Sequence, residues 1–338
     1  MKKGLRRGLI IASLIIVCGG TVFGIAMVAT WDEYDDSYVF YYKPETPASI
    51  ERISINTDIG KINVKYNTTP TDYYVRIDAD IHVVGPFVKE KSFSDFFKPI
   101  VWINESTAVL RFSLESKPMS WIMFIGGSKI KINVTLRTDV IYNINAEATT
   151  GAVEATIPNN TILDQINLEA TTGSVELFAN GVNFTNNLRA IATTGSVKLN
   201  FTNCILAGNI TGKITTGSLT LKTFKILYTQ DSNWNLDSTT GNIKIYIYQH
   251  SNMGANVKGT VDATTGNIKV VYEDNSPLVG SFYIADVTTG DIDYHDLGGF
   301  SRQLNGFGSD DFLTTANYTY SLDLEATTGN IDIYGRSS

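Results

Sequence analysis

The sequence predicts an all-β protein: a single N-terminal transmembrane helix, then a β-strand-rich cap section, then a parallel β-solenoid. Three observations predict this fold class. The tripeptide Thr-Thr-Gly occurs eight times, apolar and polar residues alternate around each copy, and an uncharged, mostly apolar run occupies residues 8–30. Together they indicate a rod of stacked coils preceded by a membrane segment.

The Thr-Thr-Gly repeat sets the coil length. Successive copies are 22–25 residues apart, except for a last interval of 39 residues. A degenerate copy, Thr57-Asp58-Ile59-Gly60, precedes them. The repeat glycines are Gly60, Gly151, Gly173, Gly195, Gly217, Gly241, Gly266, Gly290 and Gly329. Such a period is typical of a repeat architecture in which each unit buries its apolar face only against its neighbours.

The residues around each glycine predict two strands and a corner. In residues 166–177, apolar side chains fall on even numbers before Gly173 and on odd numbers after it. A period of two indicates strands, and the change of parity indicates a corner that keeps the same face inward. Glycine supplies the backbone conformation that such a corner needs. We therefore predict a right-handed solenoid over residues 141–336, with coils of about 22–25 residues.

The segments before the array break the repeat. Residues 50–140 still alternate as strands do, and we interpret them as an N-terminal β-section that starts and caps the solenoid. Residues 31–49, which begin with an aromatic cluster, are interpreted as a juxtamembrane linker. The long interval 295–317 is rich in Gly, Ser and Asp, and we expect it to fold over the side or end of the rod.

The N-terminus has the pattern of a membrane anchor. Residues 1–7 form a basic tip, and residues 8–30 are long enough for one span. The positive-inside rule places the tip in the cytoplasm and the rest of the chain outside, at the plasma membrane. The alternative is a signal segment, cleaved after Ala26 or left uncleaved. Twin-arginine export at Arg6-Arg7, a lipoprotein cysteine at Cys18 and a prepilin site after Arg7 are weaker alternatives.

Composition excludes several classes of protein. The net charge of −7 argues against a nucleic-acid partner, which needs a basic face. Two cysteines in 338 residues exclude a disulfide scaffold, and three histidines leave little room for a histidine-rich metal or catalytic cluster. The sequence predicts no cofactor.

One outward row carries the strongest metal candidates. Four residues before the glycine, Asp237, Asp262 and Asp286 recur on the outer face of their coils. Stacked in register, these carboxylates would form a weak ladder for Ca²⁺ or Mg²⁺. The favoured interpretation is a solvated acidic face that Lys244 and Lys269 partly offset.

Eight Asn-x-Ser/Thr sequons are candidate glycosylation sites. They are Asn67, Asn104, Asn133, Asn159, Asn183, Asn200, Asn209 and Asn317. We expect glycans there if the host glycosylates its surface proteins.

No catalytic motif stands out. The sequence lacks Gly-x-Ser-x-Gly, His-Glu-x-x-His and a phosphate-binding Gly-x-x-x-x-Gly-Lys loop. Carbohydrate cleavage needs a distinct pair of carboxylates, whereas the acidic residues here belong to a repeating row. A polysaccharide-active β-helix enzyme is therefore a distant alternative.

The repeat architecture resembles a known family. The glycine-centred strand–corner–strand unit, the early copy at Gly60, the strand insertion and the segment Lys-Ile-Lys-Ile-Asn-Val-Thr-Leu at 129–136 are similar to putative-adhesin β-solenoid domains of bacterial and archaeal surface proteins. The resemblance covers roughly residues 50–336. It implies a solenoid fold and transfers no catalytic residue.

These observations predict a non-catalytic, membrane-anchored cell-surface rod that acts as an adhesin or binds a ligand. The alternative is an envelope sensor or assembly scaffold that pairs with another protein. The expected partners are the membrane, a surface glycan or protein, and a second copy that pairs through the terminal coil at 322–338.

Overall fold

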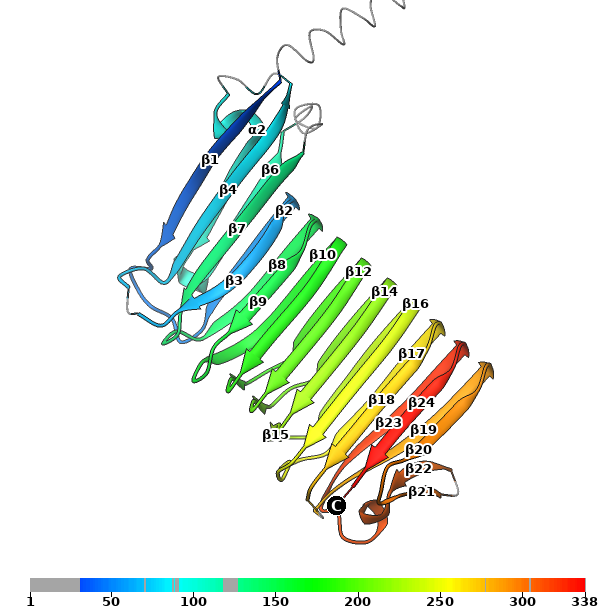
Figure 1. Cartoon of the computed structure of the whole chain (residues 1–338). Coiled ribbons are helices and arrows are strands. Elements are labelled where there is room, and N and C mark those ends of the chain that lie inside the picture. The colour runs from blue at the N-terminus through cyan, green and yellow to red at the C-terminus, as the bar shows by residue number, and fades with distance from the viewer. Residues whose placement is uncertain are drawn as a thin grey trace, which may run out of the picture.

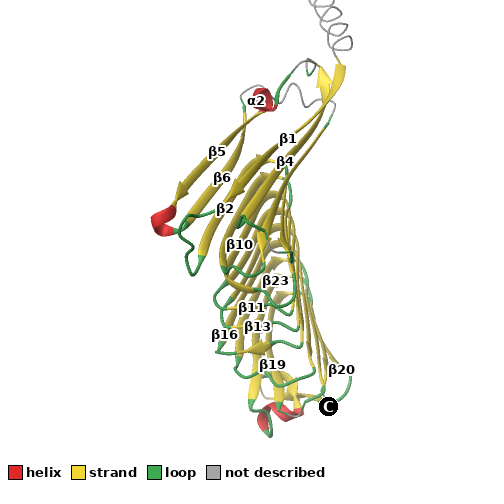
Figure 2. Ribbon diagram, turned by 90° about the vertical axis from the view of Figure 1, so that its left-hand side faces the viewer, coloured by secondary structure: helices red, strands yellow, loops and turns green. Residues whose placement is uncertain are grey.

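The computed structural model describes residues 31–337, except residues 70, 87, 89–90, 118–126, 277 and 304. The described chain is a rod of stacked coils, with the strands running across the long axis (Figure 1). Most coils consist of one strand segment before the repeat glycine and one after it. These segments build two sheets, which we call the pre-glycine sheet and the post-glycine sheet. Figure 2 shows the rod turned by 90°.

The pre-glycine sheet runs from β5 to β19. In spatial order it consists of β5 (Phe97–Asn104), β6 (Val109–Ser116), β2 (Glu51–Ile59), β8 (Tyr142–Thr150), the first halves of β10 (Ile162–Asn180), β12 (Leu188–Thr202), β14 (Ile210–Phe224) and β16 (Ser232–Gln249), then β17 (Val257–Thr265), β23 (Tyr318–Thr328) and β19 (Val279–Thr289).

The post-glycine sheet runs from β1 to β20. It consists of β1 (Trp31–Tyr42), β4 (Val75–Pro86), β7 (Ser128–Arg137), β3 (Lys61–Asn67), β9 (Val153–Ile157), the second halves of β10, β12, β14 and β16, then β18 (Ile268–Asp274), β24 (Ile331–Arg336) and β20 (Ile292–Asp296).

The remaining elements are short. β11 (Asn183–Phe184), β13 (Ile205–Leu206) and β15 (Leu227–Tyr228) form a narrow third side with the start of β10. β21 (Phe300–Gln303) and β22 (Gly306–Ser309) form a hairpin. Among the described residues, the helical elements are α2 (Phe93–Phe96) and the 3₁₀ turns η1 (Glu105–Thr107) and η2 (Asp310–Leu313).

The predicted stacking of coils is found in the structure. β10 pairs with β12 in parallel so that Gly173 lies opposite Gly195, and the same register continues through β14 and β16. The alternating apolar side chains point inward from both sheets and form one continuous core. Leu168 and Val175, on either side of the corner, are both fully buried, as the change of parity predicts.

The repeat glycines form a column that admits no side chain. Gly195 has a φ of +139°, and a Cβ placed there would lie 2.0 Å from the carbonyl oxygen of Gly173 in the neighbouring coil. The same close approach recurs from Gly151 to Gly290. Backbone conformation and stacking therefore both require glycine at this corner.

The order of coils at both ends of the rod departs from the order in the sequence. The coil of β23 and β24, last in the chain, lies between the coil of β17 and β18 and the coil of β19 and β20. Likewise, β2 and β3 lie between β6 and β7 on one side and β8 and β9 on the other. The interval 295–317 contributes the β21–β22 hairpin, whose second strand pairs with β19 at the end of the stack, as expected for a segment that folds over the end.

Two predictions need correction. The predicted fold class included one transmembrane helix, but no helix among the described residues is long and apolar enough to cross a bilayer. The helical elements found there have three or four residues each, whereas a span needs about 20. The predicted span itself, residues 8–30, lies outside the described residues. The predicted linker 31–49 instead contains β1, a twelve-residue strand that pairs with β4 over its whole length.

Candidate functional site

Outward side chains stand in rows along the rod because equivalent residues of neighbouring coils pair directly. In the post-glycine sheet, the position three after the glycine holds Lys198, Thr220 and Lys244 on successive strands. In the pre-glycine sheet, the position four before the glycine holds Lys213, Asp237 and Asp262. The two outer faces of the same coils thus carry different chemistry.

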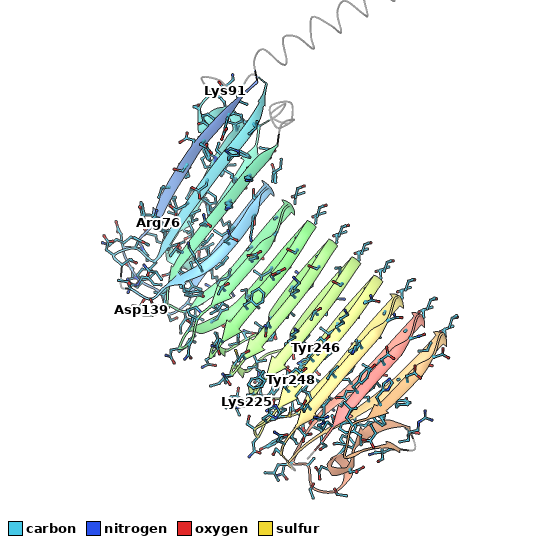
Figure 3. All side chains as sticks on the ribbon, in the orientation of Figure 1. Arg76, Lys91, Asp139, Lys225, Tyr246 and Tyr248 are labelled. Carbon is cyan, nitrogen blue, oxygen red and sulfur yellow. The ribbon has the colours of Figure 1, made fainter. Side chains whose placement is uncertain are left out.

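The outer face of the post-glycine sheet contains a hollow of about 290 Å³, which we call the lysine hollow. Its lining comes from β10, β12, β14 and β16 and consists of Phe178, Lys198, Leu199, Asn200, Thr220, Lys222, Lys244 and Tyr246. Figure 3 shows Tyr246 and Tyr248 on the ribbon of β16 and Lys225 close by. The described lining combines ammonium groups, an amide, a hydroxyl and two aromatic rings, without a carboxylate.

Aromatic rings contact one lysine of the hollow and one lysine of the neighbouring coil. The Lys222 ammonium lies 5.1 Å from the centroid of the Tyr246 ring, and Lys269 lies 4.4 Å from the centroid of Tyr334. These are cation–π distances, which favour a defined position for an otherwise mobile ammonium. The ammonium groups on the outer face of the post-glycine sheet are therefore partly preorganised.

Two of these lysines lie across from a carboxylate on the neighbouring strand: Lys198 from Glu176, and Lys269 from Asp332. The strands beside Lys222 and Lys244 place no carboxylate opposite them. Lys198 pairs with Glu176 at 2.7 Å, but Lys222, Lys244 and Lys269 form no ion pair with a described residue. Lys244 lies directly opposite Lys269 on neighbouring strands. Like charges in such a cross-strand position repel each other. The face can therefore gain stability from an anion.

The predicted acidic row lies on the opposite sheet, and its order in space differs from the order along the sequence. Because the last coil is inserted, Glu325 stands between Asp262 and Asp286, and four carboxylates follow one another from Asp237 to Asp286. Lys213 contacts Asp237 at 3.4 Å. Lys244 and Lys269, which were expected to offset this row, project from the other sheet. Their offset from beyond the corner stays a prediction, and the cation that opposes the carboxylates around Asp262 is Lys213.

Burial and neighbouring carboxylates make Asp262 harder to ionise. Partial burial raises the pKa of Asp262, Glu325 and Asp237 raise it further, and Lys213 opposes them. The carboxylates stand in a line, one per coil, and do not bring three ligand oxygens close together. The structure therefore shows an acidic face, and the Ca²⁺ or Mg²⁺ ladder on Asp237, Asp262 and Asp286 stays an untested prediction.

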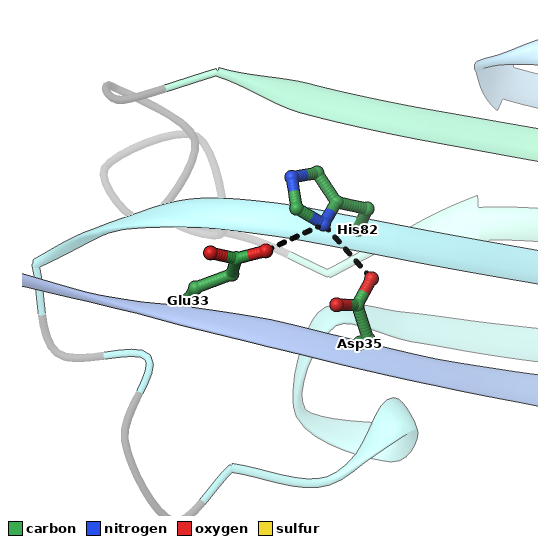
Figure 4. A group of neighbouring side chains, drawn as sticks. All are labelled: Glu33, Asp35 and His82. Carbon is green, nitrogen blue, oxygen red and sulfur yellow. Dashed lines mark hydrogen bonds and ion pairs between the residues drawn. The ribbon is translucent and has the colours of Figure 1, made fainter.

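Among the described residues, one group of side chains has the composition of a metal site (Figure 4). His82 on β4 directs Nδ1 to Asp35 Oδ1 at 2.8 Å and to Glu33 Oε1 at 3.4 Å, both on β1. Zinc accepts this donor set, but usually with a further ligand, and the described group offers three. Lys129 lies opposite His82 on β7 and disfavours an added cation. The geometry is that of an imidazole hydrogen-bonded to a carboxylate at the surface.

Sequence reasoning missed both the His82 group and the lysine hollow. The former depends on pairing between β1 and β4, and β1 was interpreted as a linker. A signal was available, since Tyr34, Tyr38 and Phe40 fall on alternate positions and are half-buried in the structure. Part of the hollow was detectable in the sequence, because Lys198 and Lys244 both stand three residues after their repeat glycine.

The predicted glycosylation sites are scattered over the rod. Asn159 and Asn317 are exposed, whereas the Asn133 amide donates to Asp80 and accepts from Asn63 within the sheet. Asn200 lines the lysine hollow. Their modification stays a prediction.

Comparison with known proteins gives structural neighbours only, because no family model and no curated protein matches the sequence. A putative cell adhesion protein from Clostridium sporogenes ATCC 15579 is 13% identical, with a TM-score of 0.32, over 90% of this chain and 100% of that chain. A putative adhesin from Bacteroides fragilis NCTC 9343 is 11% identical, with a TM-score of 0.34, over 89% and 97%. One from Parabacteroides distasonis ATCC 8503 is 10% identical, with a TM-score of 0.33, over 89% and 98%.

These neighbours carry the name of the family that the sequence resembles. Their TM-scores lie below 0.5, so no argument about what this chain binds rests on them. The functional argument rests on the faces of the rod.

Proposed function

We propose that this chain is a non-catalytic binding rod of the adhesin type that acts at the cell surface. The observation that carries the proposal is the lysine hollow, a concave patch of ammonium groups and aromatic rings on a chain whose net charge is −7. A localised positive patch on an acidic protein selects anionic partners and steers them to one face. The described lining also lacks the paired carboxylates that glycoside cleavage requires, which supports binding over catalysis.

Cell binding tests this proposal. The purified full chain is labelled and added to intact cells, and bound label is measured by flow cytometry. The test variant carries Lys198→Gln, Lys222→Gln and Lys244→Gln. Its matched control carries Lys43→Gln, Lys65→Gln and Lys98→Gln, which remove the same charge at exposed positions outside the hollow. Loss of binding in the first variant alone supports the proposal; absence of binding by the unmodified chain contradicts it.

A second candidate function is an assembly scaffold that pairs through a strand edge. The coil of β23 and β24, which was predicted to end the stack, lies inside it. The stack therefore ends with β19 and β20. β20 pairs with β24 on one side and with no other described strand. An open strand edge is a template for pairing with another chain. Sedimentation velocity tests this, and a mass that stays monomeric as concentration rises excludes self-pairing.

A further inference from the structure

We propose that the lysine hollow binds a linear carbohydrate polymer that carries anionic groups, one acidic sugar unit occupying the hollow and the chain running along the rod axis. This inference rests on the proposed binding function and names the ligand class of the same face. It draws on the lining of the hollow, on the extent of the positive stretch and on the position of the aromatic rings.

The lining fits an acidic sugar better than a bare ion. Lys198 and Lys244 project from β12 and β16, and Lys222 projects from β14 between them, so three ammonium groups surround one space. Asn200 and Thr220 add an amide and a hydroxyl that can bond to sugar hydroxyls. Phe178, with 38% of its surface exposed, supplies an apolar wall. A volume of about 290 Å³ is several times the roughly 30 Å³ of one water molecule, so the hollow has room for an organic unit.

The positive stretch continues beyond the hollow and then stops. Lys269 extends the row of Lys244 by one coil, and the same position then holds Asp332 in the neighbouring β24. In the other direction the row ends at Glu176, opposite Lys198. With neighbouring strands about 4.8 Å apart, the three steps from Lys198 to Lys269 span roughly 14 Å. A ligand that crosses several strands along the axis meets ammonium groups over this distance, as a linear polymer does.

The tyrosine rings on this face contact lysine side chains, which leaves them less free to stack with nucleic-acid bases. Single-stranded nucleic acid uses free aromatic faces as platforms for its bases. Here ammonium groups lie over the rings of Tyr246 and Tyr334. Phe178 is exposed and remains for contact with a sugar. A polysaccharide therefore fits the face better than a nucleic acid does, and the latter becomes an outcome of the test.

The experiment measures binding of the full chain, produced without glycosylation so that Asn200 is unmodified, by biolayer interferometry. The probes are oligogalacturonate, the same oligomer with its carboxylates methyl-esterified, dextran sulfate, unmodified dextran and single-stranded oligo-dT. Carboxylate and sulfate sources are thereby distinguished, each against a neutral polymer with the same backbone. The triple variants of Lys198, Lys222, Lys244 and of Lys43, Lys65, Lys98 are measured in parallel, with thermal unfolding as a check of folding.

We expect at least one anionic polysaccharide to bind and its neutral counterpart not to bind. The hollow variant should raise Kd at least tenfold and the control variant less than twofold. Phe178→Ala should raise Kd severalfold, which simple counterion attraction would not cause. Lys222→Arg should keep binding, because a guanidinium retains both the charge and the contact with the ring.

Other outcomes overturn the proposal in distinguishable ways. Equal or tighter binding of oligo-dT with the same sensitivity to the hollow variant makes the ligand a nucleic acid. Binding of dextran or the methyl ester removes the anionic requirement and leaves the binding rod intact. If cells bind in a lysine-dependent way but no polysaccharide does, the ligand class is wrong and the proposed function stands. If cells do not bind either, the proposed function fails as well.

Discussion

In the middle of the rod, from β8 to β16, each coil contacts the next coil in the sequence, whereas at both ends the chain leaves this order. Contacts in the middle join residues 22 apart, such as Asn145 and Asn167. At the ends they join residues 63 apart, such as Asn256 and Thr319, or 91 apart, such as Ser54 and Asn145. The same coil geometry is therefore built by local contacts in one region and by long-range contacts in the other.

The departure from sequence order is thermodynamically inexpensive and has a structural benefit. Loop-closure entropy grows only with the logarithm of loop length, so a separation of 63 residues in place of 22 costs about 1 kcal/mol. In return, the last coil is paired on both sides. At the N-terminal end, β4 and β5 pair antiparallel with β7 and β6 of the outermost coil, and β1 pairs antiparallel with β4. Antiparallel strands at the ends, such as β22 where it pairs with β19, interrupt the regular parallel pairing that another chain could extend.

The largest effect should come from deleting a coil at the end and not in the middle. Deletion of residues 318–338 removes β23 and β24 from inside the stack, with buried side chains that include Tyr320, Leu322, Leu324 and Ile333. At about 1.5–3 kcal/mol for each buried side chain, the loss is on the order of 10 kcal/mol. Hydrogen exchange should show β19 and β20 unprotected.

The matched control is deletion of residues 174–195, one complete coil in the middle. It joins Gly173 to Ser196, and Ser196 stands in the position of the next coil that is equivalent to Ser174, the residue that follows Gly173 in the intact chain. The remaining strands keep their register, so we expect a soluble rod that unfolds in one cooperative transition. If both deletions unfold the chain equally, the contrast between middle and ends is wrong.

A side chain in the glycine column should produce the next largest effect. Gly195→Ala places Cβ 2.0 Å from the Gly173 carbonyl oxygen, and because the clash is between two backbones, rotamer changes cannot relieve it. We expect a loss of about 4 kcal/mol or more in the free energy of unfolding, measured with urea. The control is Gly298→Ala, which has a φ of +128° but meets no atom within 4 Å. Its loss should be about 1–3 kcal/mol, the cost of backbone strain alone.

The residue after the glycine also differs between the regions. In the C-terminal coils, asparagines form a ladder: Asn267 Oδ1 accepts from the Asn330 backbone N–H at 2.9 Å, and Asn242 does the same for Asn267. In the middle coils this position is serine, as at Ser196. Asn267→Ala should cost about 1 kcal/mol, the net value of one hydrogen bond, and Ser196→Ala close to nothing. Equal losses would show that the ladder does not stabilise the end.

The regions also differ in how far the sequence predicts them. Strand alternation, parallel stacking and the glycine column follow from the period, because each corner is specified by its own residues and repeats along the chain. The order of coils at the ends is not encoded in this way. Leu322 and Leu324 can pack on the coil of Val261 as well as on that of Ala285, and an apolar period cannot choose between these neighbours.

The candidate site also has one part that the repeat predicts and one part that it does not. The positions of Lys198 and Lys244 relative to their glycines fix a shared row, so the lysine hollow could be predicted from the repeat. The contact between His82 and Asp35 could not, since it joins a strand of the cap section to a segment with no repeat of its own. The acidic row was predicted from the order of the coils along the sequence, which puts Asp286 directly after Asp262. In the structure Glu325 stands between them, because its place depends on the inserted coil.

The smallest effect tests that inserted carboxylate. Burial raises the pKa of the Asp262 carboxyl, and Glu325 beside it raises this pKa further, so the folded chain binds this proton more tightly than the unfolded chain does. The resulting stability is fully present below the unfolded pKa of about 3.9 and is lost as pH rises through the folded pKa. Asp262→Asn should therefore raise the free energy of unfolding at pH 7 by up to about 1 kcal/mol, and by nothing at pH 3.

Glu45→Gln, which removes one exposed carboxylate from a loop, is the control. Asp286→Asn should stabilise less, because Asp286 lies beside Glu325 and not beside Asp262. If Asp286→Asn proves equally stabilising, Asp262 and Asp286 are neighbours, and the last coil is not inserted between theirs.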